Sequence, residues 1–234
     1  MWAHAAWQGR FLPHRLGPDE RLRAYASWCT AVEGNTTFYA TPDAKTVASW
    51  ARQTGEDFGF LLKLPRTVTH ERRLAGGEAE LRAFLAAIEP LGPRVSALWV
   101  QLPGSFGPDD LPALAAFLRT LPRTHRIAVE VRHPAFFTQE RAARLLEGVL
   151  RGARAEWVPF DTTVLFADRP VTDAEREAWT RKPRLPRRMR ALTDRPFVRY
   201  IGRDDPELTA AGWRPWVEVF RAWLREGRSP TMFI

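Results

Sequence analysis

The sequence has very little cysteine and no long apolar run. A single Cys, Cys29, rules out an intramolecular disulfide and is typical of proteins of the reducing cytoplasm. No run of about eighteen apolar residues occurs, so no transmembrane helix is expected. The amino-terminal residues also lack the charged start and apolar centre of a secretory signal. We therefore expect a cytoplasmic protein with no membrane partner.

Several catalytic motifs are absent as well. No glycine-rich phosphate loop follows any predicted strand, which argues against a dinucleotide-binding fold. Neither a G-x-S-x-G nor an H-E-x-x-H spacing occurs, and the one cysteine falls on a predicted helix. Serine and cysteine nucleophile mechanisms therefore have no support, and no cofactor is predicted.

The charge is basic and unusual in its composition. The 35 Lys and Arg residues outnumber the 27 Asp and Glu residues, for a formal net charge of +8, yet only Lys45, Lys63 and Lys182 are lysines. With 19 prolines, this composition is typical of a coding bias towards Arg, so the charge is only modest evidence for an anionic partner. A Lys at the end of a predicted strand, as at Lys63, indicates a position that needs an amine.

Predicted strands alternate with predicted helices along the chain. Strands are expected at residues 30–35, 57–64, 95–102, 126–132, 155–161, 197–201 and 231–234. Helices are expected at residues 18–29, 41–51, 78–89, 108–121, 138–151 and 213–225. This alternation indicates parallel pairing, because each parallel connection needs a crossover. It predicts an α/β fold, a single (β/α)8 TIM-barrel-like domain over residues 1–234.

Polar side chains stand near the ends of these strands. They are Glu33, Lys63, Gln101, Glu130, Asp161 and Arg199. Glu130 and Arg132 lie on the same face of their strand, because side chains alternate. Charges at the ends of buried strands destabilise a fold unless they have partners or a use, and a structural ion pair is the alternative interpretation. In a TIM barrel these strand ends form the active-site face, so we predict one polar pocket.

The predicted pocket combines proton-transfer groups with anion-binding groups. The predicted catalytic residues are Glu33, Lys63, Glu130, Asp161 and His133. The predicted substrate-binding residues are Asn35, Tyr39, His70, Gln101, Arg132 and Arg199. Crowded acids beside cations can acquire the separated pKa values that acid–base catalysis needs, while Lys and Arg bind phosphate or carboxylate. This pattern favours a hydrolase, lyase or isomerase acting on a small anionic substrate, such as a phosphorylated sugar or a nucleotide.

Between residues 161 and 197 a long polar segment replaces the helix that the alternation would require, and it contains a basic segment, residues 181–190 (RKPRLPRRMR). The basic segment holds six basic residues and no acid, and such a run is usually a solvated loop. Above a pocket it could instead contact a phosphate-bearing ligand or a nucleic-acid backbone.

Three alternatives therefore remain. The first is a protein that binds or processes nucleic acid through Arg181–Arg190. The second is a metal-dependent hydrolase or isomerase with a divalent ion on Glu33, Glu130, Asp161 and His133, although nearby Lys63 and Arg132 would repel a cation. The third is a small-molecule binding protein without turnover.

Taken together, the motifs resemble a known family. The segment EGNTTFY at residues 33–39 is followed by Pro42, Trp50, Thr69-His70, Gln101-Leu102-Pro103 and Glu130-Val131-Arg132-His133-Pro134. This combination, which covers nearly the whole chain, is similar to the YecE-like proteins, a domain-of-unknown-function family with a TIM-barrel fold. The resemblance implies that fold and a polar pocket, but no reaction. It also implies that the barrel is incomplete, with the first strand reduced to Met1–Ala6 and the chain ending at the eighth strand.

Overall fold

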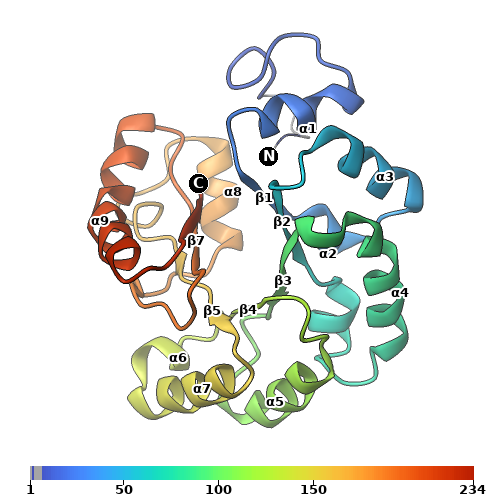
Figure 1. Ribbon diagram of the computed structural model, residues 1–234. Coiled ribbons are helices and arrows are strands. Elements are labelled where there is room, and N and C mark those ends of the chain that lie inside the picture. The colour runs from blue at the N-terminus through green and yellow to red at the C-terminus, as the bar shows by residue number, and fades with distance from the viewer. Residues whose placement is uncertain (1, 3–6) are drawn as a thin grey trace. The chain divides into compact units, whose positions relative to one another are not determined.

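The computed structural model describes residues 2 and 7–234 (Figure 1). The chain divides into two compact units, one made of residues 1–100 with 122–126 and the other of residues 101–121 with 127–234. Each unit is described by itself. No helix among the described residues is long and apolar enough to cross a membrane.

The first unit contains three parallel strands and the helices that connect them. The strands are β1 (Ala31–Gly34), β2 (Gly59–Lys63) and β3 (Val95–Gln101), of which Gln101 belongs to the second unit. The helices are α1 (Pro18–Ala26), α2 (Thr36–Tyr39), α3 (Ala44–Gln53), the π-helix η2 (Thr67–Glu71), α4 (Glu78–Ile88) and the 3-10 helix η3 (Glu89–Arg94). Helices α3 and α4 lie to one side of the three strands (Figure 1). The strand ends near residues 34 and 63 therefore lie next to each other in the sheet.

Local sequence explains how these elements begin and pack. Asp43 caps α3, because its carboxylate accepts a hydrogen bond from the Thr46 backbone N–H at 2.7 Å. All five residues of β2 are buried, which accounts for its unbroken apolar sequence before Lys63. At Gly34 an added Cβ would lie 2.5 Å from Cδ2 of Leu62, so β1 needs a glycine where it packs against β2.

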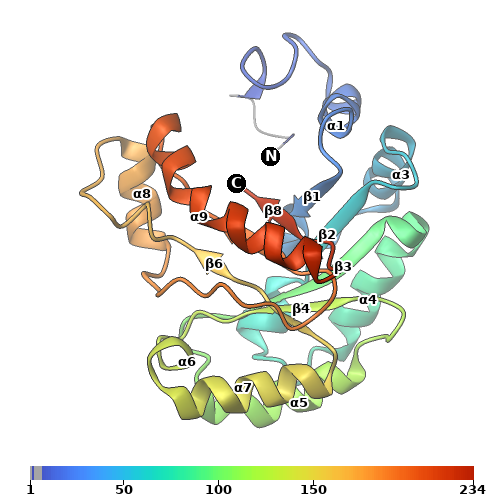
Figure 2. The same cartoon turned by 60° about the vertical axis from the view of Figure 1, so that its left-hand side comes forward.

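The second unit contains five short strands. They are β4 (Ile127–Glu130), β5 (Glu156–Trp157), β6 (Phe160–Asp161), β7 (Phe197–Tyr200) and β8 (Thr231–Phe233). The helices are the 3-10 helix η4 (Pro108–Asp110), α5 (Leu111–Thr120), α6 (Ala135–Thr138), α7 (Glu140–Gly152), α8 (Asp173–Arg181) and α9 (Pro206–Arg225). The long helix α9 lies beside β8 (Figure 2). Its Trp216 and Trp223 form an apolar cluster with Val198 of β7, against which Met232 of β8 also packs.

The predicted parallel α/β pairing is confirmed, but the predicted (β/α)8 TIM barrel is wrong. The strands form two separate sheets, in the orders β1-β2-β3-β4-β5 and β6-β7-β8, and each pairing described between strands is parallel. A TIM barrel requires eight strands in one closed sheet. The first strand predicted at Met1–Ala6 falls, apart from Trp2, outside the described residues.

A proline explains where the two sheets separate. The single strand predicted at residues 155–161 is divided into β5 and β6 by Val158-Pro159. Pro159 has no backbone N–H, so it cannot donate a hydrogen bond to a neighbouring strand. Its carbonyl instead accepts from the Arg199 backbone N–H at 2.9 Å, and β6 pairs with β7 rather than continuing the first sheet.

Two helices also differ from the sequence-based expectation. Helix α8 occupies part of the region where only a polar segment was expected, and Thr172 caps it by accepting from the Glu175 backbone N–H at 3.1 Å. Helix α9 begins at Pro206, earlier than predicted, because Asp205 accepts from the backbone N–H groups of its first turn. A proline at the first helical position is favoured, since that N–H has no partner within the helix.

Candidate functional site

In the first unit, the ends of β1 and β2 bring an acid, an amine and an amide together. Lys63 Nζ lies 2.5 Å from Glu33 Oε1 and donates to Asn35 Oδ1 at 2.9 Å. The ammonium group also lies over the Trp99 ring, 4.6 Å from its centroid. Lys63 is 1% exposed and Glu33 8% exposed, so water screens their attraction very little.

Thr37 ties these two strand ends together. Its hydroxyl lies 2.7 Å from the carbonyl oxygens of both Gly34 and Lys63 and shares its donated proton between them. The side chain is fully buried in α2, which begins directly after β1. A hydroxyl is therefore required where α2 meets the end of β2, which explains a Thr at this position of the motif 33–39.

The π-helix η2 places His70 beside α2. His70 Nδ1 lies 2.9 Å from the Thr69 hydroxyl, and its ring meets the Phe38 ring edge-on with 5.0 Å between centroids. Tyr39 meets Phe38 in the same manner at 5.2 Å, while most of its own side chain is exposed. Single π-helical turns are frequent at functional sites. Of the predicted site residues, the first unit thus holds Glu33, Asn35, Tyr39, Lys63 and His70.

In the second unit, two arginines flank Glu130 at the end of β4. Arg132 lies 2.6 Å through Nη2 from Glu130 Oε1 and donates to the same oxygen through Nε at 2.7 Å. Arg199 Nη1 lies 3.7 Å from Glu130 Oε2. Both guanidinium groups lie over the Phe160 ring, at 5.1 and 5.0 Å from its centroid. Glu130 and Arg132 thus form the ion pair of the alternative interpretation, although β4 ends at Glu130 and Arg132 lies beyond the strand in which it was predicted.

Asp161, buried at the end of β6, contacts two residues that are distant in sequence. Arg187 Nε lies 2.8 Å from Oδ2, and Trp216 Nε1 donates to the same oxygen at 2.7 Å. Thr163 donates to Oδ1 from its backbone N–H at 3.0 Å and from its hydroxyl at 2.6 Å. The neighbouring Tyr200 has a raised pKa, caused first by burial and then by the charge of Asp161. Asp161 therefore anchors the basic segment and α9 to β6.

Gln101 and His133 complete the predicted set. Gln101 is buried at the end of β3, and the next residue, Leu102, donates its backbone N–H to the Glu130 carbonyl at 2.9 Å. His133 Nδ1 accepts from the Ala135 backbone N–H at 3.2 Å, so Nε2 is the ring nitrogen that remains for proton transfer. The structure thus brings together Glu33, Asn35 and Lys63 in the first unit and Glu130, Arg132 and Arg199 in the second. The convergence of all the predicted residues into one pocket stays a prediction.

The basic segment, residues 181–190, is only partly a solvated loop. Arg188 Nη2 lies 3.0 Å from Glu147 Oε1, and its guanidinium lies 4.2 Å from the Trp157 ring centroid. Burial lowers the pKa of Arg188, against the opposing effect of Glu147. Arg190 reaches the same Glu147 oxygen at 3.3 Å. The expectation of a solvated loop is therefore wrong for Arg188, as it is for Arg187 on Asp161.

Glu156 is a buried acid that the sequence analysis did not select. Its carboxylate accepts hydrogen bonds from the backbone N–H groups of Leu192 and Thr193 and from the Thr193 hydroxyl, at 2.6 to 3.2 Å. Burial raises its pKa, and these hydrogen bonds oppose the increase. Glu156 holds the chain after the basic segment against β5, and no local pattern distinguishes it from an ordinary strand residue.

The acids predicted for a divalent metal do not fit one. Among residues 2 and 7–234, no group of three or more His, Cys, Asp and Glu side chains is arranged to hold a metal ion. Glu33 faces the ammonium of Lys63, and Glu130 faces two guanidinium groups, which would repel a metal cation. The described residues therefore lack the cluster that the metal-dependent alternative requires.

Comparisons with known proteins find similarity along the whole chain. A family model, "Protein of unknown function DUF72", matches residues 1–234. The UPF0759 protein YecE of Escherichia coli O157:H7 and that of Escherichia coli strain K12 are each 35% identical over 234 residues, which is 100% of this chain and 83% of theirs. These matches confirm the resemblance to the YecE-like family. Two crystal structures of a DUF72 family protein from Enterococcus faecalis V583 share 21% identity and a TM-score of 0.66, cover 90% of this chain and 80% and 84% of their own, and show similarity of fold alone.

Proposed function

The chain belongs to the DUF72 family of proteins of unknown function, and from this premise we propose that it binds a small anionic ligand and acts on it by acid–base chemistry. The observation that carries the proposal is the pairing of Arg132 and Arg199 with one buried carboxylate, Glu130. Among these three residues, two positive groups accompany one negative group, an arrangement whose potential favours an anion.

Arg132 supplies the contact that an anion would use. Its Nε and one Nη2 proton are directed at Glu130, and no partner for Nη1 exists within the described residues 2 and 7–234. The side chain is 16% exposed, so a ligand can reach it. A planar guanidinium with N–H groups in a fixed fork matches the oxygens of a phosphate or carboxylate.

The two guanidinium groups are also held in place before any ligand binds. Glu130 fixes each group by an ion pair, and Phe160 provides a ring against which both lie. Side chains that are already ordered lose little conformational entropy on binding, which improves affinity. This preorganisation supports a binding role in addition to a structural one.

The acid–base part of the proposal is based on Lys63 and Glu33, which both belong to the first unit. Proton transfer requires groups within hydrogen-bonding distance, and Lys63 Nζ and Glu33 Oε1 are 2.5 Å apart. Asn35 and the Trp99 ring hold the ammonium in that position. We assign proton transfer with the ligand to this pair, with the Lys63 ammonium donating a proton to the ligand and the Glu33 carboxylate accepting one from it.

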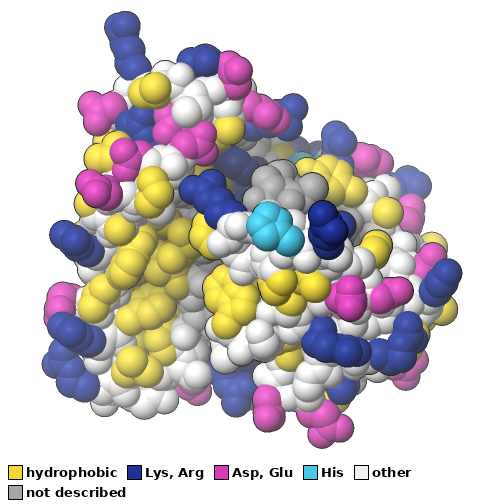
Figure 3. All heavy atoms as spheres, turned by 90° about the horizontal axis from the view of Figure 1, so that it is seen from above, with side chains coloured by type: hydrophobic (Ala, Val, Ile, Leu, Met, Phe, Trp, Pro, Cys, Tyr) yellow, Lys and Arg dark blue, Asp and Glu magenta, His cyan; other side chains and the backbone are white. Residues whose placement is uncertain are grey.

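The nucleic-acid alternative has less support. Binding to a phosphate backbone uses exposed cations, and in the basic segment Arg181, Arg187 and Arg188 each pair with an acid of this chain. On the face shown in Figure 3, Lys and Arg side chains are interspersed with Asp and Glu rather than gathered into one patch. A stripe of positive charge along which a nucleic acid could lie is therefore not visible on that face.

Binding of small anions to the purified protein tests the proposal. We expect sugar phosphates or nucleoside monophosphates to raise the melting temperature, and isothermal titration calorimetry to give their affinities. Arg132→Lys should weaken the binding of the best ligand roughly tenfold or more, because the fork geometry is lost. The control is Arg144→Lys, an exposed arginine paired with Glu140 on α7.

Two outcomes would contradict the proposal. The first is that no anion of the panel binds the wild-type protein. The second is that Arg132→Lys binds as tightly as the wild type. A polyanion that binds with a steep dependence on salt, while small anions do not bind, would favour the nucleic-acid alternative instead.

A further inference from the structure

A hollow in the second unit lies beside the Asp161 anchor. Its volume is about 250 Å³, and it is lined by Thr162, Thr163, Phe166, Ala167, Arg184 and Leu185. Thr163 connects the hollow to the anchor, because its hydroxyl donates to Asp161 and accepts from Arg187 Nη2 at 2.5 Å. The basic segment therefore forms one wall of this hollow.

Arg184 is held at the hollow by a stiff stretch of backbone. It stands between Pro183 and Pro186, and prolines restrict both their own φ and the residue that precedes them. The Pro183 carbonyl accepts from the Thr162 hydroxyl at 3.0 Å, and the Leu185 side chain is buried. Because these contacts fix the backbone on both sides, the Arg184 side chain is not needed to hold the segment.

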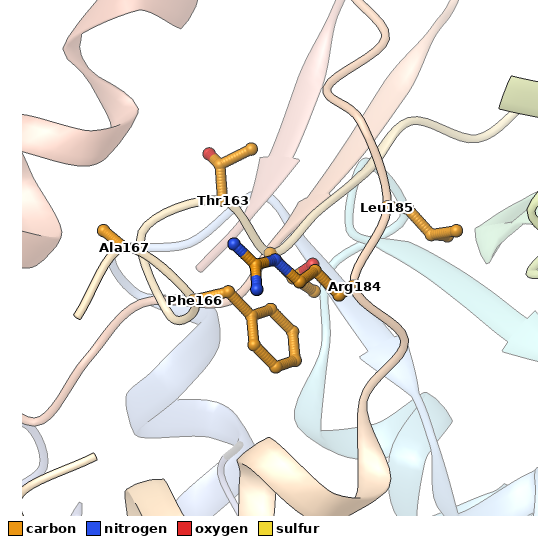
Figure 4. A pocket seen from close by; sticks show the side chains of 6 residues that line it. Thr163, Phe166, Ala167, Arg184 and Leu185 are labelled. Carbon is orange, nitrogen blue, oxygen red and sulfur yellow. The ribbon is translucent and has the colours of Figure 1, made fainter. Parts of the chain in front are cut away.

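The guanidinium of Arg184 has no ion-pair or hydrogen-bond partner within residues 2 and 7–234. It differs in this respect from Arg187 and Arg188, which pair with Asp161 and Glu147. In Figure 4 it lies between Thr163 and the ring of Phe166. The hollow thus offers a cation next to an aromatic ring.

We propose that this hollow binds a monophosphate ester of a single ring, with the phosphate on Arg184 and the carbon face of the ring against Phe166. The inference goes beyond the proposed function, because it assigns a ligand to residues other than Glu130, Arg132 and Arg199. A guanidinium binds phosphate through two parallel N–H groups. The side chains of Phe166 and Ala167 have no polar atoms, so this part of the hollow suits the carbon face of a ring rather than a second charged group.

The size of the hollow limits the ligand. Its volume of about 250 Å³ is enough for one ring with its phosphate, the part of a ligand that the hollow would hold. The ligand class is therefore a compact monophosphate, such as a pentose phosphate or an aryl phosphate.

Calorimetric titration with three probes tests the inference: ribose 5-phosphate, phenyl phosphate and inorganic phosphate. Arg184→Gln should weaken the binding of both esters roughly tenfold or more, because a charge-assisted pair is lost. The matched control, Arg181→Gln, makes the same change of charge in the same segment at an exposed residue paired with Glu177, and should bind as the wild type does. Ala167→Leu, at an exposed lining position, should reduce ester binding more than the binding of inorganic phosphate.

The outcomes separate this inference from the proposed function. Unchanged ester binding in Arg184→Gln together with weakened binding in Arg132→Lys overturns the hollow as the site and leaves the proposed function standing. If wild-type protein binds inorganic phosphate as tightly as the esters, the role given to Phe166 and Ala167 is wrong. If none of the three probes binds, the hollow is overturned, and the proposed function then depends on the other anions of its own panel. Circular dichroism and the melting temperature of each variant confirm that it is folded.

Discussion

Lys63 and Glu33 form a buried ion pair across two neighbouring parallel strands, with 2.5 Å between Nζ and Oε1. The pair stands in a chain that uses only three lysines among 35 basic residues. A buried ion pair is often no more stabilising than well-packed apolar residues of similar volume. This supports the proposed role of Lys63 in proton transfer.

Removing one partner of this pair should be far more harmful than removing both. Lys63→Met leaves the Glu33 carboxylate buried without its cation, and we expect it to lower the free energy of unfolding by about 3 to 5 kcal/mol. The double variant Glu33→Gln, Lys63→Met should recover part of that loss of unfolding free energy, because no charge is then left buried without a partner. Urea denaturation of the two single variants and the double variant measures the coupling. Equal stability of Lys63→Met and the wild type would show that the pair is not coupled.

Arg187 should contribute to the stability of the second unit, in contrast to the exposed arginines of the same segment. Arg187→Gln removes the ion pair with Asp161 and the hydrogen bond to Thr163, and we expect a loss of about 2 to 3 kcal/mol. Arg181→Gln, with the same change of charge, should stay within about 0.5 kcal/mol of the wild type. Thermal denaturation compares them, and equal melting temperatures would mean that the segment is a solvated loop after all.

Stability should fall at acid pH because of Glu175. Its hydrogen bond with Arg203 lowers its pKa from the ordinary value of 4.5 to about 2. A carboxyl group with a lowered pKa in the folded state stabilises the fold above its unfolded-state pKa, and this contribution is lost as pH falls from about 4.5 to 2. Unfolding free energies measured across this range should decrease less steeply for Glu175→Gln. Glu177→Gln, an exposed acid on the same helix, should follow the wild type.

The cap of α8 should be worth a measurable amount of stability. Thr172 accepts from the Glu175 backbone N–H and donates to the Asp204 carboxylate, so it joins the start of α8 to the segment before α9. Thr172→Ala should lower the free energy of unfolding by about 1 kcal/mol. Thr180→Ala, near the exposed end of the same helix, is the control and should change it much less. A loss no larger than that of the control would contradict a capping role.

The local pattern of residues determined much of this protein. Alternating apolar strands and helices predicted parallel pairing, because such connections require crossovers, and the strands at Ala31–Gly34, Gly59–Lys63 and Val95–Gln101 agree with it. Glu130 and Arg132 are in contact, as their spacing of two residues suggested, although β4 ends at Glu130 and Arg132 lies just beyond the strand. The motif at residues 33–39 indicated the family. Each of these features depends only on residues that are close together in the sequence.

Tertiary structure alone decided which distant residues meet. Asp161 forms an ion pair with Arg187 and accepts a hydrogen bond from Trp216, which lies 55 residues further along the chain. The sequence shows Pro159, but it does not show that β6 pairs with β7. That pairing divides the strands into two sheets instead of one barrel. Arg184 and Arg188 belong to the same run of basic residues, yet one lines a hollow and the other is paired with Glu147. Local periodicity carries no information about such contacts, because they depend on how helices and strands pack after they have formed.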